Sequence, residues 1–256
     1  MRMRAWLFAC LLPVAAWGAD GGGYARIPGG DFVSALKYED VRGPLHVAPF
    51  AIMRIPVTNG EFAAFVRKHP AWQRDAVMPV FAGSDYLGHW PSSTRPSVAQ
   101  AAQPVTRVSW FAATAYCEAQ GGRLPRWPEW EYVAAADRTR RDARSDRAWR
   151  ERILAWYGRP SSQVLPAVGS GQANAYGLHD LHGLVWEWTE DYSALLVSGD
   201  NRNQGDADQN RFCGAGTLSI NDRDNYAVLM RVAMLSSLEG SNTTMNLGFR
   251  CVREIR

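Results

Sequence analysis

The stretch GLHDLHGLVWEWTEDY (177–192) constrains the fold more than any other part of this 256-residue chain. Strand alternation in LVWEWT puts Trp186 and Trp188 on one face, which is most simply a core face, and Val185 and Glu187 on the other. A carboxylate that faces inward beside aromatic rings is costly unless a cation pairs with it. Glu187 is therefore expected to have an arginine or a metal ion as its partner, unless it lies in an exposed turn.

The same stretch offers an oxygen-only ligand set for a cation. Asp180 lies three residues before Gly183, and a glycine there can turn the chain so that its own carbonyl and that of Val185 converge with the two carboxylates, Asp180 and Glu187. Oxygen ligands in a flexible loop suit calcium. These residues alone favour an arginine salt bridge or an exposed turn over a metal ion.

The familiar catalytic motifs are missing from the sequence. His179 and His182 are three residues apart, but they lie in a glycine-bounded loop, and HExxH and CxxC are absent, so a catalytic zinc site has almost no support. GxSxG and GxxxxGK are absent as well, which argues against a serine hydrolase elbow and a phosphate-binding loop. The formal net charge is only +3, so neither nucleic acid nor an anionic membrane is expected as a partner.

The amino terminus has the layout of a secretory signal. Arg2 and Arg4 precede an apolar run over 5–16, and small residues follow it, so we expect a signal peptide at 1–19 and a periplasmic or secreted mature protein. The run is shorter than the roughly 20 apolar residues that a spanning helix needs, so no membrane association is expected after cleavage. Lipid attachment at Cys10 is disfavoured, because the apolar run continues past it.

Local signals predict short strands and helices in the first half. Glycine and proline turns split short strands within 24–34 and 45–57. The capping box TNGE (58–61) starts a helix with phenylalanines at helical spacing. Residues 83–106 are expected to form an irregular surface loop.

Two further helices and a charged segment follow. Ser109 is expected to cap a helix that runs to about 120, with Phe111, Ala115 and Ala119 as its inward stripe. A short helix is predicted over 128–136. The next segment mixes both charge signs over 137–153 and is predicted to be a solvated helix.

The last third is predicted to consist of short strands joined by long loops. Its aromatic and apolar runs are separated by Gly, Asn and Asp. The expected strands lie within LVWEWTEDY (184–192), FCGAGTLSI (212–220), YAVLMRVAML (226–235) and LGFRCVREI (247–255). Together with the helices before them, these elements indicate a loop-rich α+β architecture.

Four ordered blocks of the sequence resemble the formylglycine-generating enzyme family, also called sulfatase-modifying factors. The short opening RIPGG (26–30) is similar to the start of that family's domain as well. The resemblance implies one compact domain over 20–256, related to the C-type lectin fold. The blocks are IPVTNGEFAAFV (55–66), PVTRVSWFAATAYCEAQGGRLPRWPEWEYVAAA (104–136), NAYGLHDLHGLVWEWTEDY (174–192) and NLGFRCVR (246–253).

The resemblance assigns roles to residues of this chain. It implies a structural calcium held by the side chains of Asp180 and Glu187 and the carbonyls of Gly183 and Val185. It also implies a disulfide between Cys117, in the AYC helix, and Cys251, directly after LGFR. Cys213 is left over, and we expect it to be a buried thiol.

The catalytic copper site of the family is not matched. Formylglycine-generating members bind copper(I) through two cysteines upstream of LGFR, and these positions fall on Asp222 and Ala227. A carboxylate and a methyl group cannot replace two soft thiolates, so copper is not expected there.

The resemblance therefore favours an exported accessory or maturation factor that acts on or with a periplasmic partner protein. The segments GAGTLS (214–219) and RVAMLSSL (231–238) are most similar to family members that accompany copper-containing nitrite reductases in denitrification.

Two alternatives from other functional classes stay open. One is a metal-dependent oxidase with a non-cysteine site that draws on Asp222, Asp224, Cys213, His182 and the indoles of the 186–188 strand. The other is a lectin-like module that binds a peptide or a glycan.

Overall fold

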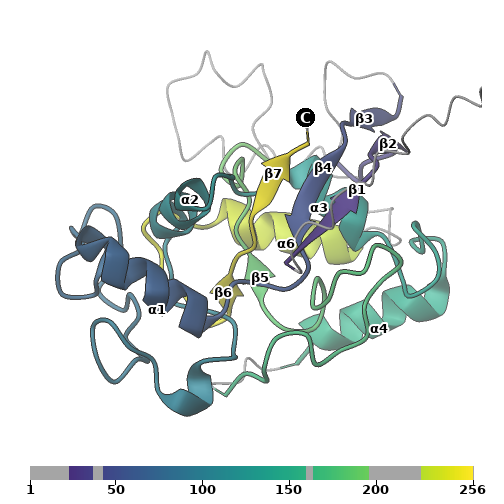
Figure 1. The fold of residues 1–256 in the computed structure, drawn as a ribbon. Helices are drawn as coiled ribbons and strands as arrows, with labels where there is room; N and C mark the ends of the chain where they lie inside the picture. Colours follow the sequence, from purple (N-terminus) through teal and green to yellow (C-terminus); the bar gives the residue numbers. More distant parts are fainter. Residues whose placement is uncertain (1–22, 37–42, 160–163, 196–225, 256) are drawn as a thin grey trace, which may run out of the picture.

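The computed structural model describes residues 23–36, 43–159, 164–195 and 226–255 (Figure 1). Helices and strands are mixed along the described chain, as the α+β prediction requires. Several sequence predictions lie outside the described residues: the signal peptide, the strand in FCGAGTLSI, and the side chains of Cys213, Asp222 and Asp224. Among the described helices, none has the length and apolar character of a membrane span.

In the part of the chain that the structure describes, seven short strands form three small sheets. The main sheet is antiparallel, in the order β1 (Tyr24–Ile27), β4 (Phe50–Met53), β7 (Val252–Glu254), so the first and last strands of the described chain share β4 as their neighbour. β4 reads FAIM and is buried along its whole length, as expected of a central strand. The two other pairs are β2 (Gly30–Phe32) with β3 (Leu45–Val47), antiparallel, and β5 (Trp186–Glu187) with β6 (Leu247–Gly248), parallel.

The capping-box helix forms as predicted. α1 (Asn59–Lys68) begins after Thr58, whose hydroxyl accepts a hydrogen bond from the Glu61 amide, while the Glu61 carboxylate accepts one from the Thr58 amide. Its inward face packs Phe62 against Phe249, with ring centroids 6.0 Å apart. The loop that follows is irregular, as expected, with single 3-10 turns at Pro70–Trp72 and Val98–Gln100.

The second helix also begins where expected, but the predicted stripe is wrong. α2 (Trp110–Ala119) is capped by Ser109, whose hydroxyl accepts from the Ala112 amide. Its buried face comprises Ala112, Ala113, Tyr116 and Cys117, whereas Phe111, Ala115 and Ala119 are partly or fully exposed. The buried face lies at a different angle around the helix axis from the predicted face, because Cys117 faces the core, where it is bonded to Cys251.

The charged segment is a helix only in its second half. Residues 137–146 form turns, and α4 (Arg147–Tyr157) begins after Asp146, whose carboxylate accepts from the Trp149 amide. α3 (Trp127–Ala134) precedes these turns. The prediction of a solvated helix from 137 was therefore wrong at its start, because the Asp137 carboxylate binds the Thr139 and Arg140 amides in a turn instead.

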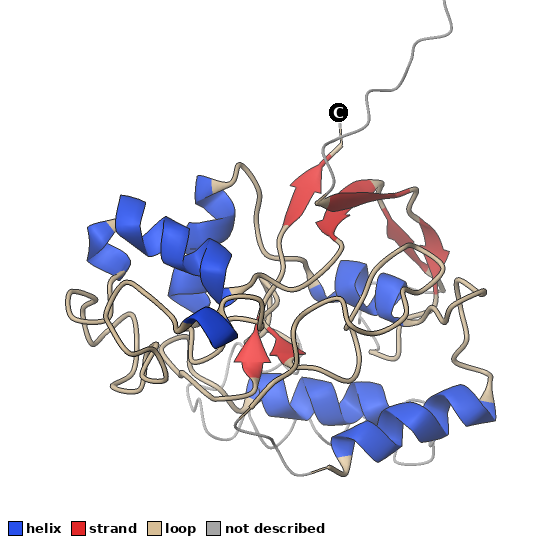
Figure 2. Cartoon of the chain, turned by 60° about the horizontal axis from the view of Figure 1, so that its bottom comes forward, coloured by secondary structure: helices blue, strands red, loops and turns tan. Residues whose placement is uncertain are grey.

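The predicted strand in YAVLMRVAML is wrong as well. This segment is a helix, α6 (Tyr226–Ser236), and it lies against α4 (Figure 2). The buried residues of this segment include Arg231, Val232 and Leu235. Positions i, i+1 and i+4 can share one face of a helix, whereas the buried positions of a strand alternate along the chain. An apolar run of this length is ambiguous by periodicity, and its packing against α4 decides the outcome.

One disulfide joins the second helix to the last strand. Cys117 and Cys251, the pair that the resemblance implies, are bonded to each other with their Cα atoms 5.5 Å apart, and both are fully buried. They are separated by 134 residues in the 256-residue sequence, so the bridge closes about half of the chain into one loop.

Removing this bridge is expected to destabilise the fold strongly. Replacing both cysteines by alanine should lower the free energy of unfolding by roughly 2–5 kcal/mol, because the unfolded chain loses a long-range constraint. Chemical denaturation with and without a thiol reductant measures the effect. The reductant should weaken the wild type and leave the double variant unchanged, and an equal effect on both proteins would show that the reductant does not act through this bridge.

Candidate functional site

The centre of the site is a buried ion pair. Glu187 of β5 and Arg250, which lies between β6 and β7, both have no exposed surface. Arg250 donates from Nη2 to Oε1 at 2.7 Å and from Nε to Oε2 at 2.9 Å. The indole of Trp130 in α3 donates to Oε2 at 2.8 Å. The cationic partner that we expected for a buried Glu187 is thus an arginine.

Arg250 also connects three separate segments of backbone. Its Nη1 donates to the carbonyl of Met53 at 3.1 Å, and its Nη2 donates to the carbonyl of His179 at 2.8 Å. These contacts join the end of β4 and the 177–183 loop to the strand that carries Glu187. The irregular loop is therefore positioned by a buried charge and not by a sheet.

A second buried arginine lies on the other side of Glu187. Arg231 of α6 places its guanidinium 3.5 Å from the centroid of the Trp130 ring and donates from Nη2 to the Glu187 carbonyl at 2.7 Å. Burial is the main cause that lowers the pKa of Arg231 to about 10, so the side chain is still charged at neutral pH. Its Nε and Nη1 lack hydrogen-bond partners in the described part of the chain. The cluster thus contains two arginines and one carboxylate.

The two carboxylates expected to bind calcium both accept hydrogen bonds from the protein itself. Both Glu187 oxygens accept hydrogen bonds from Arg250 and Trp130, and Asp180 points its Oδ2 at the Gly169 amide, 2.5 Å away. Gly183 does turn the chain, with φ of 105°. Across the described ranges, no group of three His, Cys, Asp or Glu side chains could hold a metal ion. This absence concerns side-chain clusters and not the two backbone carbonyls of the expected set, so calcium binding by these four residues stays a prediction.

The two histidines of the motif do not meet either. His179 donates from Nδ1 to the carbonyl of Gly171 at 2.8 Å, whereas His182 donates from Nε2 to the carbonyl of Ala134 at 2.9 Å. The His182 ring lies edge-on between Trp130 and Trp149, with centroids 5.7 Å from each. Burial is the main cause that lowers the pKa of His182 to about 4, so its ring is neutral at pH 7.

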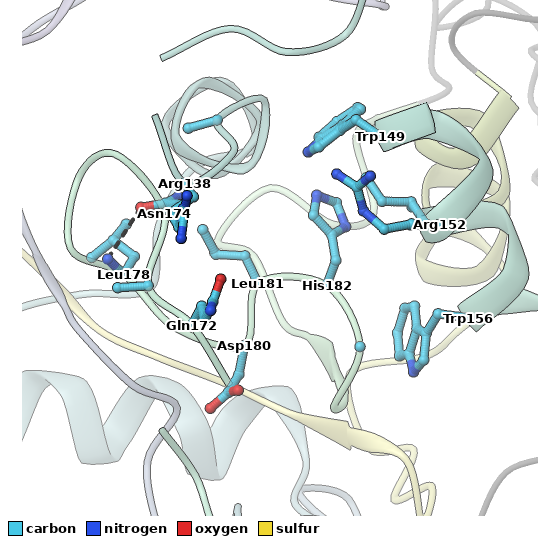
Figure 3. A pocket seen from close by; sticks show the side chains of 14 residues that line it. Arg138, Trp149, Arg152, Trp156, Gln172, Asn174, Leu178, Asp180, Leu181 and His182 are labelled. Carbon is cyan, nitrogen blue, oxygen red and sulfur yellow. Dashed lines mark hydrogen bonds between the residues drawn. The ribbon is translucent and has the colours of Figure 1, made fainter. Parts of the chain in front are cut away.

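A cavity of about 310 Å³ lies beside this motif, between α4 and the 172–183 loop (Figure 3). It is lined from α4 by Trp149, Arg152, Ile153 and Trp156, and from the loop by residues that include Asp180 and His182. Sequence reasoning missed this cavity. The signal was present, because the α4 residues recur at intervals of three or four in AWRERILAWY and so share one helix face.

The two positions that the resemblance aligns with the copper-binding cysteines of the family have no described side chains. Asp222 lies outside the described residues, and Ala227 lies in α6 without a described side chain. Trp188 is fully buried, as its core role requires, while Trp186 is only partly buried and stacks on Tyr157 with centroids 4.8 Å apart. The oxidase alternative also draws on Cys213, Asp222 and Asp224, which lie outside the described residues, so it stays open.

Fold and site together define a single α+β domain in which the acid of a Trp-Glu-Trp strand neutralises a buried arginine from the Leu-Gly-Phe-Arg segment. The chain belongs to the family of the sulfatase-modifying factor enzyme 1-like domain, which matches residues 18–255.

The relatives of this chain include proteins that are named as enzymes and one that is named as inactive. The chain is 30% identical to "Formylglycine-generating enzyme" of Streptomyces coelicolor, covering 91% of this chain and 89% of that one. It is 29% identical to "Inactive C-alpha-formylglycine-generating enzyme 2" of Mus musculus, covering 96% and 90%. It is also 34% identical to "Hercynine oxygenase" of Mycolicibacterium smegmatis, over 64% of this chain and 44% of that one. Membership of the family therefore does not fix the activity.

A double-mutant cycle tests the central ion pair. Glu187→Gln and Arg250→Met should each lower the free energy of unfolding by roughly 3–5 kcal/mol, because each leaves a buried group without its partner. The double variant should lose clearly less than the sum of the two, and chemical denaturation measures all three. Glu151→Gln, which breaks the exposed Arg147–Glu151 pair on α4, is the matched control and should have no measurable effect. Strict additivity at the buried pair would show that the two groups do not interact in solution.

Proposed function

We propose that this chain is an exported accessory or maturation factor of its family, that it acts on or with a periplasmic partner protein, and that it does not generate formylglycine. The observation that carries the proposal is the disposition of the cysteines. The chain has four, and two of them, Cys117 and Cys251, are buried in a disulfide. Cys10 lies in the predicted signal peptide, which leaves Cys213 as the one thiol of the expected mature protein.

A single thiol does not suffice for the chemistry of the active family members. Copper(I) in that site requires two soft thiolate ligands. The sequence from 214 to 246 contains no cysteine, so no shift of register within it restores the pair that falls on Asp222 and Ala227. The similarity to a mouse protein that is named as inactive, over almost the whole chain, supports the same conclusion.

The proposed partner is a copper-containing nitrite reductase. The support is the resemblance of GAGTLS (214–219) and RVAMLSSL (231–238) to family members that accompany such enzymes. The expected signal peptide at 1–19 would bring the chain to the compartment where those reductases work. The lectin-like relation of the fold, which the resemblance also implies, is compatible with a role in binding a protein surface.

An activity assay tests the absence of formylglycine formation. The purified mature chain is incubated with a peptide that contains CxPxR, together with copper and a thiol reductant, and the peptide mass is measured. We expect no conversion of the cysteine above the rate of copper alone, whereas the Streptomyces coelicolor relative should convert the peptide under the same conditions. Conversion by this chain at a rate above the copper control would end the proposal and return the chain to the oxidases.

A binding experiment tests the partner. The mature chain and a purified copper-containing nitrite reductase are mixed and analysed by size-exclusion chromatography with light scattering, with an unrelated periplasmic cupredoxin in place of the reductase as the control. We expect a complex with the reductase alone. Metal analysis of the isolated chain accompanies the test, and stoichiometric copper or iron in it would favour the oxidase alternative instead.

A further inference from the structure

The cavity beside α4 has large apolar side chains on two sides. Trp149, Ile153 and Trp156 line it from one face of the helix, and Leu178 and Leu181 line it from the 172–183 loop. Figure 3 shows the two indoles on one side of the cavity and the two leucines on the other. A volume of about 310 Å³ is at the small end of ligand sites and accommodates a single ring with a short substituent.

Two arginines line the cavity without carboxylate partners. Arg138 and Arg152 are both exposed, and within the described ranges neither forms an ion pair. Asp180 is the one acidic side chain in the lining; its Oδ2 accepts from the Gly169 amide, and Figure 3 shows its carboxylate pointing away from α4. A guanidinium group without a protein partner is suited to bind a ligand carboxylate.

The charges behind the cavity add to this preference. Among the described residues, Glu187 is the carboxylate that pairs with these two buried arginines, Arg231 and Arg250. The neutral ring of His182, which lines the cavity, lies against Trp130, the same indole on which Arg231 stacks. An uncompensated positive charge in a buried region favours anions in its vicinity.

His182 supplies a hydrogen-bond acceptor. Because its Nε2 donates to the Ala134 carbonyl, Nδ1 of the neutral ring can only accept. Nδ1 is buried and has no partner in the described part of the chain. Figure 3 shows the ring extending from the loop toward Trp149 and Arg152. A buried acceptor without a donor is costly, and a ligand hydroxyl or N–H would satisfy it.

We infer that this cavity binds a small aromatic carboxylate that carries a hydroxyl group: the ring lies between the indoles and the leucines, an arginine holds the carboxylate, and the hydroxyl donates to His182. Neither the accessory role nor a nitrite reductase partner is needed for this inference. The same chemistry is found in a free hydroxyaromatic acid and in a peptide that ends in tyrosine.

A ligand series tests the inference on the mature chain by isothermal titration calorimetry. We expect para-hydroxyphenylacetate to bind, and phenylacetate, which lacks the hydroxyl, to bind about tenfold more weakly. Tyramine, which has the ring and hydroxyl but a positive charge, should not bind. Equal affinity for the first two would contradict the hydrogen bond from the ligand hydroxyl to His182, and binding of tyramine or of none of the three at millimolar concentration would overturn the inference.

Matched variants locate the binding to this cavity. Arg152→Gln should weaken binding of para-hydroxyphenylacetate about tenfold, because one charged hydrogen bond is lost. Arg147→Gln removes the same charge from α4, but this arginine pairs with Glu151 and does not line the cavity, so the affinity should not change. His182→Phe preserves a ring between the tryptophans and should abolish the preference for the hydroxyl. Melting temperatures show that each variant is folded, and equal losses in Arg152→Gln and Arg147→Gln would contradict the assigned site.

A peptide arm separates the two sources of the ligand. The tripeptide Gly-Gly-Tyr with a free carboxylate is compared with its amide and with para-hydroxyphenylacetate. Tighter binding of the free-carboxylate peptide than of the acid identifies a protein terminus as the natural ligand class. Binding of para-hydroxyphenylacetate alone identifies a free metabolite as the natural ligand class. Binding of the peptide amide as tightly as the free-carboxylate peptide would contradict the role of the arginine.

Discussion

The buried pair of Glu187 and Arg250 is the interaction on which the rest of the structure depends. Each group alone would be costly in an apolar interior, and together they form hydrogen bonds with each other, with Trp130 and with the backbone carbonyls of Met53, Arg54 and His179. Those carbonyls belong to the end of the central strand and to the 177–183 loop. One charge interaction therefore positions segments that no regular secondary structure connects.

This arrangement explains why a loop-rich domain can have a defined cavity. The wall formed by Leu178 to Gly183 contains no helix or strand, yet its backbone is tied to Arg250 at His179 and to α3 through His182. The opposite wall is α4, which lies against α6. Arg231 of α6 stacks on Trp130 and donates to the Glu187 carbonyl. The buried cluster of Glu187, Arg231 and Arg250 therefore supports both the α4–α6 pair and the 177–183 loop. Ligand binding at the cavity and stability of the core are thus physically coupled.

Sequence patterns predicted the features that depend on neighbouring residues. The caps at Thr58 and Ser109 determine where two helices begin, and both are satisfied within four residues. The demand for a cation beside Glu187 was also readable, because burial of a carboxylate between tryptophans has a known cost. The resemblance, and not the pattern, supplied the pairing of Cys117 with Cys251.

The failures concern contacts between distant parts of the chain. The apolar run at 226–235 has no period strong enough to exclude a strand, and only its packing on α4 makes it a helix. The inward face of α2 was placed wrongly because nothing local shows that Cys117 faces the core. The partner of Glu187 lies 63 positions away, and the cavity arises from α4 and a loop that meet only in the folded state.

The disulfide has a consequence for the ion pair, since Cys251 is the residue directly after Arg250. In a reducing compartment the bridge does not persist, and the arginine would then be held in the core by noncovalent contacts alone. A chain retained there would more often release its last strand, expose a charged interior and become a substrate for proteases. Oxidation after transport would close this route, so quality control of the chain would be linked to the redox state of its surroundings.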